Sequence, residues 1–286
     1  MLKKITLLAM AIIAGISLRA QTDTTVKATE STADTVKIGN IIILKNGGSG
    51  TGSIGPSHSD WDINIYRHKR NKPANLSTTW LNMDFGFNNV KDNTNYSGSE
   101  NWDYAKGSNA DWFNQRNNKS INFNLWIVMQ RLNMIKHVVN LKYGLGLEYY
   151  NFRYEENIRF SKNPPAIKMD PVIEYSKNKL ALNYVTVPLM LNFNFTPKNS
   201  EFRSFGLSAG ISASYLYNSR QKYISNETGK AKLKGDLGLE DFKLAYIGEV
   251  KLGPVSLYGS YATKSMFRKE LDQTPYAVGI RLGTWY

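Results

Sequence analysis

Five charged side chains on the polar face of a repeating pattern are the first candidates for chemistry: Asp84, Lys142, Glu148, Glu249 and Arg281. Each stands where polar and apolar residues alternate. Acids and bases placed in this way can form a buried ion-pair network that holds a structure closed, because an unpaired charge in such a place is costly. Alternatively, they can line a gated conducting path. The choice between these roles depends on the elements that carry them.

Other chemistry has little support in the sequence. The chain has no cysteine, which excludes a disulfide scaffold, a thiolate zinc site and a cysteine nucleophile. The glycine-rich stretch 47–55 lacks the lysine of a phosphate-binding loop and predicts a flexible linker. Asp92, Glu100, Asp103 and Asp111 match no calcium-loop spacing, so we expect them to be solvated. We therefore expect no catalytic, metal or cofactor site.

A polar segment over 89–119 carries four aromatic residues: Trp102, Tyr104, Trp112 and Phe113. Exposed aromatic side chains among Asn, Ser and Gly can contact a sugar or a protein, and loops on rigid scaffolds often carry binding sites. The same residues could equally pack against one another as extensions of the flanking strands. Both alternatives stay open at this point.

The first twenty residues have the composition of an export signal. Lys3 and Lys4 precede an apolar run at 5–18, and Ala20 is followed by polar residues. This order predicts a cleaved secretory signal peptide over 1–20. Its removal takes away three of the 36 basic residues and no acidic one, which leaves a net charge of 33 − 23 = +10. Export argues against nucleic acid as a partner, and anionic lipid or lipopolysaccharide matches the charge better.

Residues 21–75 are expected to form a flexible periplasmic segment. Thr, Asp, Ser and Ala dominate 21–37, and a Gly/Ser-rich stretch follows at 46–53. The apolar residues within 37–44 predict one short strand between these linkers. A single strand cannot bury itself, so it must join a sheet edge, pair with a partner or stay mobile.

From residue 76 onward, apolar and polar residues alternate with the period of a β-strand. Eight such segments occur, at 81–88, 122–130, 139–149, 184–195, 205–215, 242–252, 255–261 and 276–286. Alternating segments of about ten residues, separated by turn residues, are typical of transmembrane β-strands. A mean hydropathy of −0.40, with no second long apolar run, excludes a polytopic helical membrane protein.

The connections between these segments alternate in length. Short ones fall at 134–137, 196–203 and 253–254, and long polar ones at 89–119, 153–179, 218–241 and 264–275. Outer-membrane barrels have short periplasmic turns and long outer loops, and an even strand number returns both ends to the periplasmic side. His137 then lies in a periplasmic turn, while His58 and His68 precede the barrel. None of the three stands where a barrel enzyme needs its histidine.

A soluble β-barrel or sandwich would show the same alternation, but two features favour the membrane. The polar face is rich in Gly, Ser, Asn and the five charges, which suits a narrow interior, and aromatic residues lie near the segment ends, where interface girdles occur. The sequence therefore predicts an all-β fold: an eight-stranded antiparallel up-and-down transmembrane barrel over 76–286. A barrel of this size is only wide enough for side chains to fill.

Several motifs are shared with a known family: WLNMDFGFN at 80–88, YVTVPLML at 184–191, GLSAG at 206–210 followed by SRQK at 219–222, LYGSY at 257–261, and KIGN at 37–40 before the barrel. Together they resemble the porin-family, PorT-like outer-membrane β-barrel proteins of Gram-negative bacteria. The resemblance covers the barrel, and it implies the outer membrane and a small barrel without a defined ligand.

Three functions follow as expectations. The first is a non-enzymatic outer-membrane barrel with a side-chain-filled interior and a structural or interaction role through its long outer loops. Its N-terminal segment and C-terminus would lie in the periplasm, and its partners would be outer-membrane lipid, lipopolysaccharide and a protein or glycan at the loops. The second is a small pore for ions or solutes. The third is a soluble exported barrel that binds an apolar ligand inside.

Overall fold

The structure, a computed structural model, describes residues 35–38, 41–44, 74–197, 203–227 and 229–283. The predicted signal peptide, His58 and His68 lie outside these residues. The chain divides into two compact units, Met1–Asn71 and Lys72–Tyr286, which are described separately.

In the first unit, β1 (Thr35–Ile38) and β2 (Ile41–Leu44) pair in antiparallel fashion. The prediction of one short strand over 37–44 is therefore wrong. The dipeptide between the two strands, Gly-Asn, is one of the sequence signals for a hairpin between two apolar runs. Two strands that pair with each other satisfy part of the hydrogen bonding that a lone strand would lack.

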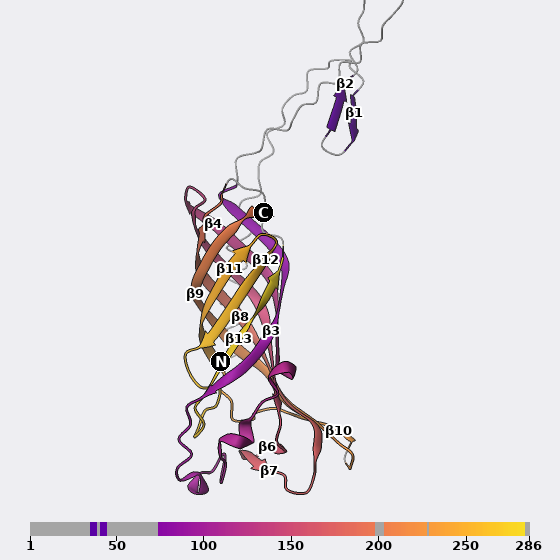
Figure 1. The fold of residues 1–286 in the computed structure, drawn as a ribbon, viewed down its shortest axis with the longest axis vertical. Helices are drawn as coiled ribbons and strands as arrows, with labels where there is room; N and C mark the ends of the chain where they lie inside the picture. Colours follow the sequence, from indigo (N-terminus) through magenta and orange to yellow (C-terminus); the bar gives the residue numbers. More distant parts are fainter. Residues whose placement is uncertain (1–34, 39–40, 45–73, 198–202, 228, 284–286) are drawn as a thin grey trace, which may run out of the picture. The chain divides into compact units, whose positions relative to one another are not determined.

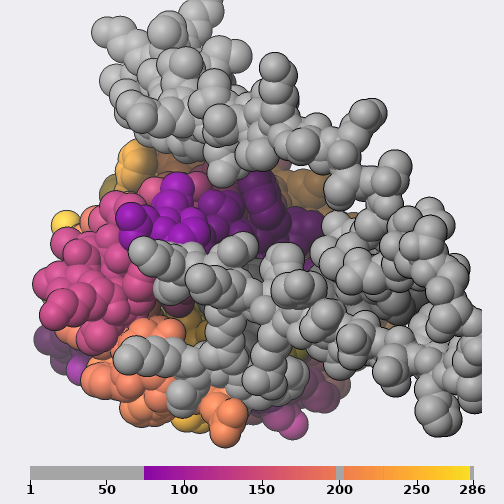
Figure 2. All heavy atoms as spheres, turned by 90° about the horizontal axis from the view of Figure 1, so that it is seen from above, coloured from indigo at the N-terminus to yellow at the C-terminus, as the bar shows by residue number. Residues whose placement is uncertain are grey.

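The second unit is built around a closed antiparallel sheet (Figure 1). Its wall strands are β3 (Leu76–Asp92), β4 (Ile121–Ile135), β5 (Val139–Tyr154), β8 (Tyr175–Asn194), β9 (Phe205–Ser225), β11 (Phe242–Leu252), β12 (Val255–Ala262) and β13 (Gln273–Leu282). β13 pairs with β3, and β8 pairs with β9, so these eight strands close into a ring. Seen end-on in Figure 2, the segments follow one another around the wall, from β3 in purple through magenta to orange. The predicted eight-stranded antiparallel barrel is confirmed.

The alternation of side chains along the strands sets the inside and the outside of the barrel. On β8, Val187 and Leu189 are 51% and 47% exposed, whereas Thr186 before them and Met190 after them are buried. Successive side chains of a strand point to opposite faces of the sheet, so the apolar ones lie outside and the polar ones inside. We call the outward apolar side chains the outer apolar band. This arrangement is the reverse of a water-soluble barrel.

The connections divide the barrel into two ends. The turn end holds the short links at 136–138, 195–204 and 253–254, and the loop end holds the long links at 93–120, 155–174, 226–241 and 263–272. The predicted alternation of short and long connections is confirmed. His137 lies in the first short turn, as predicted.

The long links contain short elements of their own: η1 (Ser99–Asn101), η2 (Ala110–Phe113), η3 (Asn117–Lys119), β6 (Ile158–Lys162), β7 (Pro165–Met169) and β10 (Gly229–Lys234). β6 pairs with β7, and β10 pairs with the outer part of β9. Among the described residues, no helix is long and apolar enough to cross a membrane.

Several strands extend further toward the loop end than the sequence predicted, and β8 and β9 extend furthest. β8 begins at Tyr175 instead of 184, and β9 continues to Ser225 instead of ending at 215. β9 pairs with β11 up to Tyr215 and with β10 from Arg220 onward. The extension was missed because its outward positions are charged, so the contrast between apolar and polar positions disappears. We call residues 151–154, 175–183, 218–225 and β10 the loop-end sheet.

Candidate functional site: the barrel interior and the loop end

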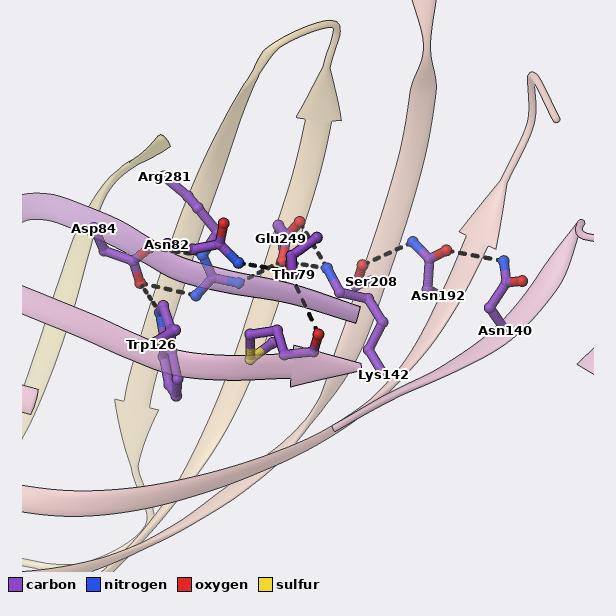
Figure 3. Close-up of polar contacts among 11 residues, drawn as sticks. Thr79, Asn82, Asp84, Trp126, Asn140, Lys142, Asn192, Ser208, Glu249 and Arg281 are labelled. Atoms are coloured by element: carbon purple, nitrogen blue, oxygen red, sulfur yellow. Dashed lines mark hydrogen bonds and ion pairs between the residues drawn. The ribbon is translucent and has the colours of Figure 1, made fainter. Parts of the chain in front are cut away.

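Arg281 is the centre of the ion-pair network inside the barrel (Figure 3). Its Nε and Nη2 donate to the two carboxylate oxygens of Asp84 at 2.6 and 2.8 Å, and its Nη1 donates to Glu249 Oε2 at 2.8 Å. Lys142 Nζ donates to both oxygens of Glu249, at 2.9 and 2.8 Å. All four side chains are buried. A two-pronged contact of arginine with a carboxylate is among the strong hydrogen bonds, so these four residues form one connected unit.

Strand register brings this network together. Arg281 on β13 and Asp84 on β3 are direct partners across the seam where the barrel closes. Trp126 Nε1 donates to Asp84 Oδ2 at 2.7 Å, and the Arg281 guanidinium lies 5.1 Å from the centre of the indole ring. Gly146 leaves room for that ring, because a Cβ at this position would lie 2.5 Å from Trp126 Cε3. The last strand is therefore tied to the first through charge, hydrogen bonds and ring contact.

Glu148, the fifth predicted residue, belongs to a separate pair. Lys243 Nζ donates to Glu148 and, at 3.3 Å, to the hydroxyl of Tyr150. The same Nζ lies 4.4 Å and 4.8 Å from the ring centres of Tyr150 and Tyr184, within cation–π distance. Lys243 was not among the predicted network residues, although its place on the polar face of its segment was visible in the sequence. Finding its partner requires the three-dimensional closure of the barrel, because β5 and β11 are not neighbours in the sheet.

The fully buried charges of the interior are matched in number, and they leave little space. Three cations, Lys142, Lys243 and Arg281, face three carboxylates, those of Asp84, Glu148 and Glu249. The cavity lined by the three carboxylates and Arg281 measures ≈ 20 Å³, which is about the volume that one water needs. A larger hollow of ≈ 320 Å³ is lined by Tyr184, Lys243 and Met266 among others, and none of its lining residues belongs to the Arg281 network.

Toward the loop end the interior changes from polar to aromatic. Inward-facing positions on β5 run through Asn140, Lys142 and Glu148 and then continue as Tyr150, Phe152 and Tyr154, all buried. Side chains from all four long links pack onto these rings: Tyr104, Ala105, Phe113, Ile158, Phe160, Ile167, Leu237, Leu239, Met266, Phe267 and Leu271. We call this cluster the loop-end core. It covers the loop-end mouth of the barrel with apolar side chains.

The four loop aromatics from the sequence analysis lie in or against this core. Tyr104 and Phe113 are buried, with 4% of their surface exposed, and they take the packing role rather than a surface one. Trp102 and Trp112 are half-buried against the same cluster. The Tyr104 hydroxyl donates to the Leu237 carbonyl at 2.5 Å, which fastens the first long link to the third.

A single carboxylate fastens the first long link to the fourth. Glu270 accepts hydrogen bonds from the backbone N–H groups of Asp103, Tyr104 and Ala105, at distances between 2.8 and 3.1 Å. Hydrogen bonds to a charged acceptor are stronger than neutral ones. The link that the sequence presents as a polar loop is therefore held at several points.

The acidic residues of the first long link do not form a metal site in the described part of the chain. No group of three His, Asp or Glu side chains there is arranged to hold an ion. Asp92 instead accepts hydrogen bonds from the Tyr96 hydroxyl at 2.6 Å and from Gln273 Nε2 at 2.9 Å.

An eight-stranded barrel with apolar side chains outside, ion pairs inside and long links at one end defines the class of outer-membrane β-barrels. The chain belongs to the family described as the outer membrane protein beta-barrel domain, which matches residues 81–263. The outer membrane is accordingly its location.

Two solved structures match this chain at low identity. Ail, the attachment invasion locus protein of Yersinia pestis, is 12% identical over 72% of this chain and 98% of its own, with a TM-score of 0.30. A mutant porin of Rh. blastica is 10% identical over 73% of this chain and 100% of its own, with a TM-score of 0.18. A search of curated proteins gave no match.

Proposed function

We propose that this chain is a non-enzymatic, PorT-like barrel that does not conduct and that acts as a structural or interaction protein through its loop end. In this proposal the signal peptide 1–20 is removed, the long links face outward, and the segment 21–75 and the C-terminus lie in the periplasm. Of the four loop aromatics from the sequence analysis, Trp102 and Trp112 are the half-exposed ones that a glycan or protein partner can reach.

The observation that carries this proposal is an interior closed at two levels. The Arg281 network fills the polar part of the interior beside a cavity of ≈ 20 Å³, and the loop-end core covers the mouth beyond it. Ions would have to pass both a set of paired charges and a layer of packed rings. The alternative of a small pore would need both of these levels to open.

Planar-bilayer recording tests whether the barrel is closed to ions. We expect the purified full-length protein to give no steady conductance, because no continuous aqueous path crosses the two levels. Phe160→Ala, which removes a buried ring from the loop-end core alone, serves as a comparison: it should stay closed as well, because the Arg281 network still fills the polar part of the interior. Steady and reproducible channels from the unaltered protein would favour the pore instead.

Fractionation of cells combined with surface proteolysis tests location and orientation. Trypsin added to intact cells should cut at the exposed Lys106 in the first long link and spare the segment 21–75. Heat-modifiable migration on gels shows in parallel that the barrel is folded. Recovery of the protein in the soluble fraction would support an exported soluble barrel, and cleavage within 21–75 on intact cells would reverse the proposed orientation.

A further inference from the structure

The loop-end sheet carries a concentration of positive charge. Its strands contribute eight basic residues to one face: Arg153, Lys177, Lys179, Arg220, Lys222, Lys230, Lys232 and Lys234. The first five are half-buried and the three on β10 are exposed. β8, β9 and β10 contain no acidic residue at all.

The strand register aligns these cations in rows. Arg153 pairs with Lys179, Lys179 with Lys222, and Lys222 with Lys232, so four positive side chains stand directly opposite one another across four strands. Directly opposed residues lie about 5 Å apart at their Cβ atoms, and like charges in such pairs destabilise a sheet. Arg220 and Lys234 form a second opposed pair, one row nearer the barrel.

A bulge on β9 creates this alignment. Asn183 pairs with Asn218 and Tyr184 with Leu216, so Tyr217 has no partner on β8. An extra residue in a strand turns all following side chains to the other face. Without it, Arg220 and Lys222 would point toward the interior instead of lying beside Lys179.

No carboxylate within the described residues pairs with these charges, although Arg153 Nη2 donates to the Ser176 carbonyl at 2.8 Å. None of the eight side chains lies within ion-pair distance of a carboxylate. Burial, and after it the neighbouring cations Lys177, Arg220, Lys222 and Arg153, together lower the pKa of Lys179 to about 8. The group lies beyond the outer apolar band, where it can exchange protons with water.

Lysines often protect an edge strand from pairing with another chain. That role accounts for the three lysines of β10, which is an edge of the sheet. It does not account for Lys179 and Lys222, because β8 and β9 have strand partners on both sides in this region. It does not account for Arg153 either, because beyond the last pair of β5 with β4 the Arg116 N–H donates to the Arg153 carbonyl and Gln115 forms a bridge with Tyr154. These three opposed cations within the sheet need a different explanation.

The position of the rows identifies the ligand. Lys177 and Lys179 share their face of β8 with Val185 and Val187 of the outer apolar band, so they point sideways from the wall. Arg153 is four residues beyond the outward Tyr149 on β5, or about 13 Å along the strand at about 3.3 Å per residue. In the proposed orientation this is the level of the headgroups of the outer leaflet.

We propose that the loop-end sheet binds the phosphate groups of lipopolysaccharide molecules that surround the barrel. Phosphates placed between opposed cations would neutralise the repulsion within the rows. The proposal rests on the outward orientation of the loop end proposed above, and it adds a site and a ligand chemistry.

The test compares two pairs of substitutions in the purified full-length protein in detergent micelles. Lys179→Gln with Lys222→Gln removes two charges from the central row, and Lys106→Gln with Lys269→Gln removes two exposed charges from other links, so the net charge is matched. Binding of fluorescent lipopolysaccharide should weaken about 30-fold in the first variant, at about one tenfold step per 1.4 kcal/mol and about 1 kcal/mol per cation. The second variant should change the affinity less than about 2-fold.

Further arms of the experiment identify the source of the anion. Dephosphorylated lipopolysaccharide should bind the unaltered protein about as weakly as the intact lipid binds the Lys179/Lys222 variant. Heparin, a soluble sulfated polysaccharide, should compete poorly. If heparin binds as tightly as lipopolysaccharide and loses affinity in the same variant, the ligand is a soluble polyanion and the assignment to the leaflet is overturned.

Folding is checked separately. Without lipid, the Lys179/Lys222 variant should unfold at the same temperature as the unaltered protein or higher, because repulsion has been removed. Equal affinity of both variants for lipopolysaccharide would overturn the proposal even if fractionation and proteolysis support the orientation. Triple replacement of the β10 lysines by glutamine tests the role of that strand. If the three lysines only protect the edge, aggregation of the protein should rise and its affinity for lipopolysaccharide should be unchanged. That result would argue against a binding role for β10.

Discussion

The barrel interior and the loop-end sheet both contain several charged side chains, but the two regions differ in whether these charges are paired with charges of opposite sign. Inside, three cations meet three carboxylates at hydrogen-bonding distance, and every one of these side chains is buried. On the loop-end sheet, eight cations share one face and no carboxylate lies among them. The strands β5, β8 and β9 run through both regions.

The difference follows from the counter-ions that can reach each region. A charge inside a filled barrel has no access to counter-ions, so the protein must supply its partner or bear a large desolvation cost. A charge on the outer face of the wall can be neutralised by salt or by a ligand. Balanced charge therefore indicates a structural role inside, and unbalanced charge indicates an external partner outside.

The largest expected effect comes from removing the centre of the interior network. Arg281→Met leaves the carboxylates of Asp84 and Glu249 buried without their shared cation, which should cost about 5 kcal/mol of stability. Urea unfolding in detergent, followed by heat-modifiable migration, measures the loss. Arg281→Lys is the control, because it keeps the charge and loses the two-pronged contact, and it should be intermediate. An unchanged midpoint for Arg281→Met would contradict a structural role for the network.

Breaking the second interior pair should have a smaller effect. Glu148→Gln removes the carboxylate from Lys243, but the rings of Tyr150 and Tyr184 still face the ammonium group. We expect a loss of about 3 kcal/mol, because cation–π contacts of about 1 to 2 kcal/mol remain. The same urea titration measures it. A loss as large as that of Arg281→Met would show that the aromatic rings contribute nothing.

An exposed ion pair supplies the reference for the Arg281→Met and Glu148→Gln variants. Arg268 donates to Asp236 at 2.8 Å and to Asp241 at 2.9 Å, and its side chain is 37% exposed. Solvent-exposed pairs contribute about 0 to 1 kcal/mol, so Arg268→Ala should change the unfolding midpoint little. If this variant were as unstable as Glu148→Gln, burial would not be the property that separates the regions.

The smallest expected effect is a dependence of stability on pH that arises outside the barrel. The pKa of Lys179 in the folded chain is about 8, against an ordinary value of 10.5, so the unfolded chain binds more protons between these values. Stability should therefore rise as the pH increases from about 8 to about 10. Urea midpoints at pH 7.5 and 9.5, compared with those of Lys179→Gln, test this contribution. An equal rise in both proteins would assign it to other groups.

The barrel itself was predictable from the sequence because its strands obey one rule. Along β8, the residues Val185, Val187 and Leu189 face outward in strict alternation, and the short and long links confirm the count of strands. The five interior charges were also visible, since alternation alone places them on the polar face. Their pairing was not, because Lys243 and Glu148 come from strands that meet only across the closed barrel.

Two features of the loop end could not be predicted in the same way. The loop-end core takes a few apolar residues from each link, such as Phe113, Phe160, Leu239 and Phe267, and each link by itself looks polar. The cation rows depend on the bulge at Tyr217, which shifts the alternation by one residue. A single unpaired residue leaves no signature in the sequence, and its effect appears only when the strands are set side by side.

The place of Arg281 in the chain has a consequence for how the barrel is completed. It stands on β13, the last wall strand, whereas Asp84 stands on β3, the first, and Glu249 on β11. Until β13 arrives, both carboxylates lack the guanidinium that neutralises them. The pairing of β13 with β3 therefore closes the barrel and brings the guanidinium to the two carboxylates in the same step. Before that step, the unneutralised carboxylates make the unclosed barrel less stable. The strand that completes the ring thereby also completes the neutralisation of the buried carboxylates.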